Sequence, residues 1–193
     1  QYVDLISEKV KGLSSGIDDK MQIGSMIMDQ NCNKVKEHIA EIKDQDKVIR
    51  GESIDHKMYI APTLIIEPSS DARVVNEETF GPVISLRSFE SEDELLEKVH
   101  KTGYGLAGSV FGTNMKRVNS ILSQLKIGNV SINDVFTHYG IASLPFGGEG
   151  LSGFGRLHGM EGLRALCRTK SVVRNRFNFI PDPWWFNRSK RVE

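Results

Sequence analysis

The sequence predicts an α/β domain in which a mainly parallel sheet is flanked by helices. Three strand-like segments, at 83–89, 106–112 and 129–133, alternate with two helical patterns at 91–101 and 114–126. Strands that alternate with helices of this length are joined by right-handed crossovers and therefore run parallel. A chain of 193 residues is long enough to bury one core of this kind.

The N-terminal part adds helical patterns at 1–13 and 29–43 and an extended segment at 58–66. The apolar faces of the two helices consist of Val3, Ile6 and Val10 in the first and of Val35, Ile39 and Ile42 in the second. No capping residue stands ahead of the first helix, so its pattern starts part-way through. We therefore expect a chain that begins inside a longer protein.

A capping box and an apolar stripe support the two central helices. Ser91 and Glu94 stand in capping-box positions at the start of the first. The second carries a stripe made of Met115, Val118, Ile121, Leu122 and Leu125. The glycine-rich and aromatic stretch at 134–159 is too long for a simple connection, so we expect it to carry function. A helix near 158–168 and a strand at 170–177 complete the predicted fold.

Charge and cysteine content narrow the class of partner and the compartment. Twenty-five basic side chains balance 25 acidic ones, so no overall field would attract nucleic acid or an anionic membrane. The two cysteines lack metal-ligand spacing and the five histidines are dispersed, which predicts no metal site. No signal peptide or membrane-spanning stretch is visible. We expect a cytoplasmic protein without a nucleic-acid partner.

Two groups of residues have an ordinary structural interpretation. The glycines between 147 and 155 match neither a P-loop nor a dinucleotide fingerprint. They are better explained by close backbone approach, with Phe146 and Phe154 anchored beside them. Cys32 and Cys167 are interpreted as buried structural thiols, the second on a helix face with Leu163 and Leu166.

The segment EETFGPV at 77–83 allows two interpretations. In one, it is a loop between a helix and a strand, with its acids in water and its ring in the core. In the other it is a ligand site, where a carboxylate holds hydroxyl groups and the phenylalanine stacks on a planar group. The residues alone leave both open.

Four longer segments resemble the aldehyde dehydrogenase superfamily. They are EETFGPVISLRSF, GYGLAGSVFG, GNVSIND and LPFGGEGLSGFGRLHGMEGL, followed by KSVV. In this order they resemble the C-terminal half of that superfamily's catalytic domain, with coverage from residue 1 to about 177. The resemblance implies three parts: a portion of the catalytic domain at 1–169, an oligomerisation strand at 170–177 and a C-terminal tail at 178–193.

The resemblance favours the ligand interpretation of 77–83. It implies that Glu78 accepts hydrogen bonds from the nicotinamide ribose of NAD or NADP, and that Phe80 and Leu106 lie at the nicotinamide. It further implies that Phe146 forms an aromatic wall of the tunnel for a small-molecule aldehyde, with Phe136 and Tyr139 at its mouth. Ordinary loop packing remains an equal alternative for Phe136 and Tyr139.

The resemblance places none of the reacting groups in this chain. It implies a cysteine that attacks the aldehyde, an oxyanion hole and a glutamate that activates water, all upstream of this sequence. The cysteine is expected about twenty residues before Gln1. We therefore expect no catalytic residue here, with Glu78 not the general base. The rival hypothesis is a non-enzymatic assembly module that retains the fold.

Oligomerisation is the last expectation. The resemblance implies that 170–177 leaves its own domain and joins a sheet between subunits of a homo-oligomer. The tail at 178–193 is aromatic and basic, which suits either a membrane interface or a neighbouring subunit, and we favour the subunit.

Overall fold

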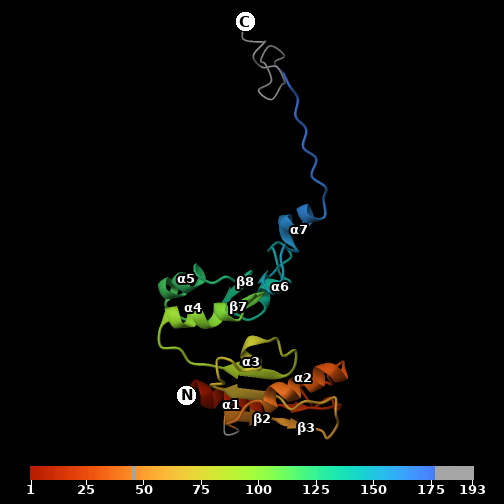
Figure 1. Ribbon diagram of the computed structural model, residues 1–193, viewed down its shortest axis with the longest axis vertical. Helices are drawn as coiled ribbons and strands as arrows, with labels where there is room; N and C mark the ends of the chain where they lie inside the picture. The colour runs from red at the N-terminus through yellow and green to blue at the C-terminus, as the bar shows by residue number, and fades with distance from the viewer. Residues whose placement is uncertain (45–46, 177–193) are drawn as a thin grey trace.

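Two lobes follow one another along the chain, each built around a pair of parallel strands (Figure 1). The computed structural model describes residues 1–44 and 47–176. In the N-terminal lobe, β4 (Thr63–Ile66) is central. It pairs antiparallel with β2 (Val48–Arg50) and parallel with β5 (Val83–Leu86).

Three helices pack on this sheet and close the N-terminal core. They are α1 (Tyr2–Lys11), α2 (Asp29–Ala40) and α3 (Arg73–Asn76). The fully buried Leu64 and Ile65 lie at the centre of β4. Ile65 packs with Ile42 and Val48, while Val35 of α2 packs with Cys32 and Ile60. The short parallel strands β1 (Ser14–Ser15) and β3 (Glu52–Ser53) lie beside this core.

The second lobe is formed by residues 91–158 (Figure 1). Its elements are α4 (Glu92–Lys101), β6 (Tyr104–Gly105), β7 (Ala107–Val110), α5 (Met115–Leu122), β8 (Asn129–Ile132), α6 (Thr137–Gly140) and β9 (Glu149–Gly150). Strand β7 pairs parallel with β8, and β6 pairs antiparallel with β9. Val118 and Ile121 of α5 and Leu96 of α4 are buried.

The predicted α/β class is confirmed, but the sheet is divided. Three of the five strand pairs between the described strands are parallel. No described hydrogen-bond ladder joins β5 to β7, so the β4–β5 and β7–β8 pairs belong to separate sheets. The alternation of strands and helices predicts parallel pairing correctly, whereas it carries no information about which strands are neighbours.

The helix caps follow the sequence closely. The Ser91 hydroxyl accepts a hydrogen bond from Glu94 N at 3.2 Å, and the Glu94 carboxylate accepts one from Glu90 N at 2.7 Å. Asn114 caps α5 by accepting from Arg117 N. Helix α5 ends at Leu122, earlier than the predicted 126, and turn hydrogen bonds continue to Leu125.

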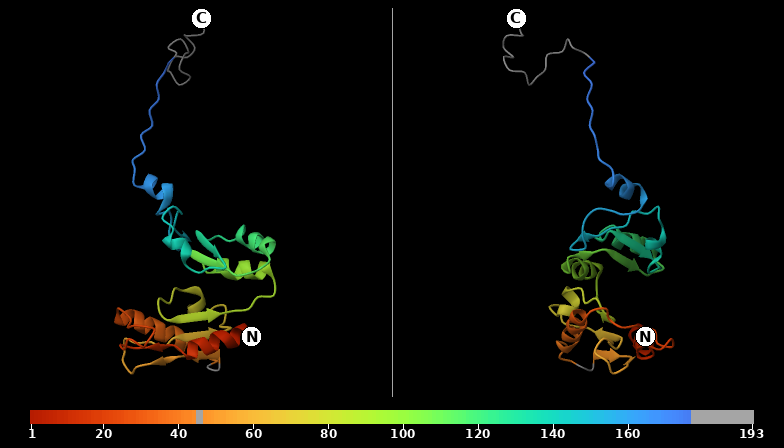
Figure 2. Two further views of the ribbon diagram at one scale, coloured as in Figure 1. Left: turned by 180° about the vertical axis from the view of Figure 1, so that it is seen from behind. Right: turned by 90° about the vertical axis from the view of Figure 1, so that its right-hand side faces the viewer.

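The C-terminal part extends away from both lobes (Figure 2). Helix α7 (Gly159–Ala165) is shorter than expected and buries only Gly162 among its residues. The prediction of a buried Cys167 is therefore wrong: Cys167 is exposed, as are Leu163 and Leu166. The apolar spacing of Leu163, Leu166 and Cys167 does mark one face of the α7 region, but no described element packs on that face.

The structure forms no strand over the described part of the predicted strand at 170–177, namely 170–176. Val172 and Val173 are exposed, the second to 94%. A strand that pairs with a second subunit would be unpaired in one chain, so the intersubunit strand stays a prediction. Phe177 and the predicted tail at 178–193 lie outside the described residues.

Candidate cofactor and substrate site

The loop 77–82 joins α3 to β5 and carries the EETFGPV motif. Glu77 has extended backbone angles and ends α3. Phe80 has a φ of 52°, in the left-handed region that a bulky side chain rarely adopts. Such a conformation persists only where the surroundings enforce it, and it is commonest at binding and catalytic sites. The loop is therefore a candidate binding element.

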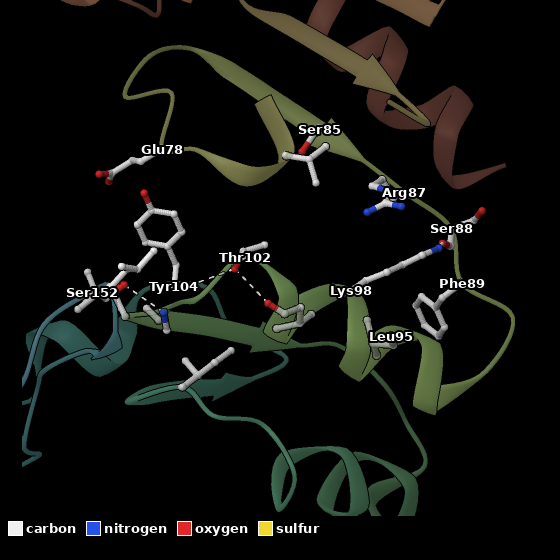
Figure 3. Close-up of a pocket in the computed structure, with 17 residues that line it drawn as sticks. Glu78, Ser85, Arg87, Ser88, Phe89, Leu95, Lys98, Thr102, Tyr104 and Ser152 are labelled. Atoms are coloured by element: carbon white, nitrogen blue, oxygen red, sulfur yellow. Dashed lines mark hydrogen bonds between the residues drawn. The ribbon is translucent and has the colours of Figure 1, made fainter. Parts of the chain in front are cut away.

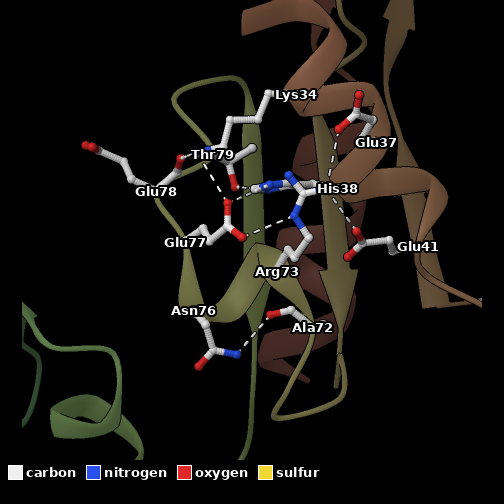
Figure 4. A network of polar contacts seen from close by, with 10 residues as sticks. All are labelled: Lys34, Glu37, His38, Glu41, Ala72, Arg73, Asn76, Glu77, Glu78 and Thr79. Atoms are coloured by element: carbon white, nitrogen blue, oxygen red, sulfur yellow. Dashed lines mark hydrogen bonds and ion pairs between the residues drawn. The ribbon is translucent and has the colours of Figure 1, made fainter.

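A polar network holds the start of this loop against α2 and α3 (Figure 4). Lys34 Nζ donates a hydrogen bond to the Glu78 carbonyl oxygen at 2.7 Å. Arg73 donates to the carboxylates of Glu77 and Glu41, each at 3.1 Å. The hydrogen bond from Arg73 holds the pKa of the Glu77 carboxyl below its usual range. The backbone of the motif is thus fixed while the Glu78 side chain stays free.

His38 is the buried member of the network. Its side chain is fully buried, and Nδ1 lies 3.1 Å from Thr79 Oγ1. Its Nε2 lies 3.5 Å from Glu77 Oε2. Burial, with the nearby Arg73 charge, lowers the pKa of His38, so the imidazole is neutral near pH 7.

A cleft between the two lobes brings two of the predicted cofactor residues together (Figure 3). Its volume is about 780 Å³. Glu78 lines the wall formed by the N-terminal lobe, and Leu106 lines the opposite wall between β6 and β7. The remaining lining residues are Val75, Ser85, Arg87, Ser88, Phe89, Leu95, Lys98, Val99, Thr102, Tyr104, Gly105, Ala107, Ile127, Leu151 and Ser152.

Some polar groups of the cleft have hydrogen-bond partners within the protein and others do not. Lys98 Nζ is committed to the Ser88 carbonyl oxygen and to Glu94, each at 2.6 Å. Arg87 Nε is buried without a hydrogen-bond partner among the described residues. The Glu78 side chain is exposed and lies opposite Tyr104 (Figure 3). The cleft therefore combines apolar walls with polar groups that a ligand can engage.

Phe80 is not part of the cleft wall. Its ring is 70% exposed and lies outside the lining residues, although Glu78 is only two positions away. The predicted contact between Phe80 and a nicotinamide ring stays a prediction.

The predicted tunnel residues form an aromatic cluster. The Tyr139 ring lies 5.9 Å from Phe136 and 5.1 Å from Phe146, edge to face with the second. His138 stacks on Phe146 at 5.9 Å, and His158 lies 6.2 Å from Phe146. Neither histidine was singled out from the sequence. His158 lies inside the segment LPFGGEGLSGFGRLHGMEGL, and His138 directly precedes the predicted tunnel residue Tyr139.

Two polar side chains, those of Ser131 and Asp134, hold this cluster in place. The His138 Nδ1 atom lies 2.7 Å from the hydroxyl of Ser131 on β8. Asp134 accepts hydrogen bonds from Thr137 Oγ1 and from two backbone N–H groups, and the bond from Thr137 does most to lower the pKa of this carboxyl. The aromatic loop is therefore attached directly to the end of the β7–β8 pair.

The glycine-rich stretch brings backbone segments into close contact, as predicted. A Cβ on Gly147 would lie 2.3 Å from the Gly155 carbonyl oxygen. Phe146 is anchored by two 2.7 Å backbone hydrogen bonds with Leu157. The prediction that Phe154 is anchored is wrong, because its side chain is fully exposed.

Residues 1–44 and 47–176 contain neither a cluster typical of a metal site nor a helix typical of a membrane span. No group of three or more His, Cys, Asp and Glu side chains there is arranged to hold a metal ion. None of the described helices has the length and hydropathy to cross a membrane.

The sequence model of the aldehyde dehydrogenase family matches residues 1–172. The chain belongs to the aldehyde dehydrogenase family. Betaine aldehyde dehydrogenase of Bacillus subtilis is 32% identical over 170 residues, a match that covers 84% of this chain and 34% of that protein. The 4,4'-diapolycopene aldehyde oxidase of a Methylomonas species is 30% identical over 188 residues, covering 96% of this chain and 36% of the other.

A solved aldehyde dehydrogenase structure shares the fold. Betaine aldehyde dehydrogenase of Staphylococcus aureus, crystallised in complex with NAD+, matches with a TM-score of 0.71 and 29% identity. The match covers 85% of this chain and 34% of that one. This aldehyde dehydrogenase chain thus spans about a third of the length of these relatives.

Proposed function

We propose that this chain is the C-terminal portion of the catalytic domain of an NAD(P)-dependent aldehyde dehydrogenase, with 1–169 as that portion. The observation that carries the proposal is the cleft, which has Glu78 on one wall and Leu106 on the other. The strained, anchored loop beside Glu78 supports the same assignment.

The residues of the cleft fit the ribose end of a nicotinamide nucleotide. A free carboxylate can accept hydrogen bonds from two vicinal hydroxyls, and Glu78 presents one in the cleft. Leu106 offers an apolar surface to a planar ring. When bound, the nucleotide would accept a hydride from the substrate, and the part of Glu78 and Leu106 is to orient it.

The aromatic cluster is proposed as the aldehyde entrance. Phe146, Tyr139 and Phe136 are in ring contact in series, and the last two are more than half exposed. An apolar, aromatic entrance suits an aldehyde with a hydrophobic or planar substituent.

The nucleophile is proposed to lie outside these 193 residues. The Cys32 thiol is buried and faces the Met58 sulfur at 3.9 Å, so an aldehyde cannot reach it. Cys167 lies beyond the end of α7, and its thiol donates a hydrogen bond to the carbonyl oxygen of Leu163 within that helix. Both cysteines are free, which agrees with the proposed cytoplasmic location.

The test of the proposal uses the product of the complete reading frame that contains this sequence. The purified protein should form NADH or NADPH in the presence of an aldehyde. The rival assembly module is favoured instead if no aldehyde in a panel of aliphatic, aromatic and cationic compounds supports this reaction with either nucleotide.

Glu78→Gln is expected to impair use of the nucleotide in the full-length protein. The change keeps the side-chain size but weakens the charge-assisted hydrogen bonds to the ribose. The free energy of nucleotide binding should therefore become less favourable by about 1–3 kcal/mol. Steady-state kinetics should show a raised apparent KM for NAD(P)+ or slower hydride transfer. The exposed Glu97 on α4 lies outside the cleft, so Glu97→Gln is the matched control. Equal kinetics for the two variants would contradict the role of Glu78.

The chain is expected to self-associate through the segment 170–176. Val172 and Val173 are exposed there, and an exposed apolar segment of β-branched residues tends to pair with a strand of another subunit. Light scattering should find a dimer or larger homo-oligomer for 1–193 and a smaller species for a chain that ends at Arg168. If both chains are monomeric, the proposed oligomerisation strand at 170–177 is wrong.

A further inference from the structure

His38 lies at the junction between α2 and the cofactor-binding loop, yet it touches no part of the cleft (Figure 4). It projects from the third turn of α2 and is fully buried. A buried polar side chain needs partners for its ring nitrogens, because an unsatisfied one costs free energy. The two partners that face His38 are Thr79 and Glu77, the residues on either side of Glu78.

These partners assign the tautomer. Glu77 is a carboxylate that can only accept, and it faces Nε2 at 3.5 Å, so its charge favours the tautomer with the proton on Nε2. Nδ1 then carries the lone pair and accepts a hydrogen bond from Thr79 Oγ1 at 3.1 Å. The Nε2 contact is longer than a hydrogen bond, and Nε2 has no other partner among the described residues. The Thr79 contact is therefore the stronger link.

Charged groups surround His38 from each element packed against it. Lys34 and Glu37 belong to α2, and Glu41 caps the C-terminus of that helix. Arg73 belongs to α3, and Glu77 belongs to the loop. Arg73 links Glu41 and Glu37 to Glu77. Arg73 shares its positive charge among these three carboxylates, and burial of the ring keeps the imidazole a neutral hydrogen-bonding group.

The contacts of His38 bear directly on the orientation of Glu78. Lys34 fixes the carbonyl group of Glu78, and His38 fixes the side chain of Thr79, one turn apart on α2. Immediately after them, Phe80 adopts its left-handed conformation. A bulky residue relaxes to negative φ unless its neighbours are held, so loss of the Thr79 anchor would let the loop turn.

We propose that neutral His38 is a positioning residue, which binds the Thr79 hydroxyl and so holds Glu78 in the orientation that receives the nucleotide ribose. The proposal rests on the proposed function of Glu78. His38 itself touches neither nucleotide nor substrate in this scheme. Its effect is exerted through the backbone of residues 77–80.

Substitutions in the full-length protein distinguish the effect of the hydrogen bond between His38 and Thr79 from the effect of burying the His38 side chain. Asparagine places an acceptor near the Nδ1 position, whereas glutamine reaches the Nε2 position and lacks the Thr79 contact. His38→Gln and Thr79→Val should raise the apparent KM for NAD(P)+ by about three- to tenfold, the effect of one lost buried hydrogen bond. His38→Asn should stay within about twofold of wild type. The double variant His38→Gln/Thr79→Val should be no worse than either single change.

Cys32→Ala provides the control for burial. Cys32 is also buried on α2, but its partner is Met58 rather than the loop. This variant should lower the melting temperature without changing the KM for NAD(P)+. The same KM change in Cys32→Ala as in His38→Gln would show that His38 acts only through the stability of α2.

The pH dependence gives a second readout. The folded pKa of His38 lies below its ordinary value of about 6.5, so the neutral ring predominates at pH 7. Between that ordinary value and the folded pKa, the unfolded chain takes up a proton that the folded chain does not, and stability falls as the pH falls. Below the folded pKa, Nδ1 is protonated, so the Thr79 hydroxyl must rotate to accept instead of donating, and the buried ring carries a charge that disturbs the loop. The KM for NAD(P)+ should therefore rise on acidification in wild type more than in His38→Asn.

The tautomer is tested on chain 1–193 itself. Nitrogen-15 NMR of the imidazole, assigned with the His38→Asn variant, should find Nδ1 unprotonated and Nε2 protonated at pH 7. A charged ring at pH 7, or the opposite tautomer, would overturn the proposal. So would an active wild-type enzyme whose KM is unchanged in His38→Gln and Thr79→Val. An inactive wild-type enzyme with the expected NMR spectrum would instead count against the proposed function of Glu78.

Discussion

Chain 1–193 by itself is expected to produce no NADH or NADPH from any aldehyde, whereas the product of the complete reading frame is expected to do so. The reaction as proposed needs an accessible thiolate within reach of the aldehyde, and a base to activate water. Cys32 is closed off by the core around Val35 and Ile60, and Cys167 lies beyond α7. Neither thiol lines the cleft that contains Glu78.

The measurement is aldehyde-dependent nucleotide reduction followed by absorbance, at matched molar concentrations of the two proteins. Cys32→Ser and Cys167→Ser in the full-length protein should retain activity when corrected for folded protein. Turnover by chain 1–193 that disappears with either serine substitution would identify that cysteine as the nucleophile and refute its structural assignment.

The features that sequence reasoning predicted well are those set by local chemistry. The capping box at Ser91 forms because a hydroxyl and a carboxylate three residues apart meet backbone N–H groups at any helix start. Helical spacing likewise predicted the buried Val35 of α2 and the buried Val118 and Ile121 of α5, whereas Met115, at the start of the predicted α5 stripe, is exposed. Glu78 and Leu106, which the family resemblance linked, line one cleft, and their role in binding the nucleotide stays a prediction.

The features that were missed depend on contacts distant in sequence. Apolar spacing around Leu163 and Leu166 marks a face, but only a covering element makes it buried, and none is described here. His38 gave no signal, because a lone histidine on a helix shows neither its burial nor its distant partner Thr79. His138 and His158 likewise gain meaning only from their contacts with Phe146.

Gly128 lies between the cleft that contains Leu106 and the loop that carries Phe146 of the aromatic cluster. Gly128 precedes β8 and packs on the loop of residues 145–148, here called the PFGG loop. A Cβ added to Gly128 would lie 1.8 Å from the Gly147 carbonyl oxygen. The neighbouring Asn129 donates hydrogen bonds from Nδ2 to that same carbonyl at 2.8 Å and to the Leu106 carbonyl at 2.6 Å. Any movement of Gly147 away from a side chain at 128 would therefore disturb the Asn129 bridge.

Gly128→Ala should consequently destabilise chain 1–193 by about 3 kcal/mol or more, because the obstructing atoms are backbone and cannot rotate away. Gly140→Ala is the matched control, since a Cβ there meets nothing within 4 Å, and it should change stability by less than about 0.5 kcal/mol. Denaturant unfolding gives the two free energies, and hydrogen exchange should show lost protection at Phe146 and Leu157 in Gly128→Ala alone. Equal unfolding free energies for the two variants would mean that the PFGG loop does not pack on β8, and the link between the cleft and the aromatic cluster would be lost.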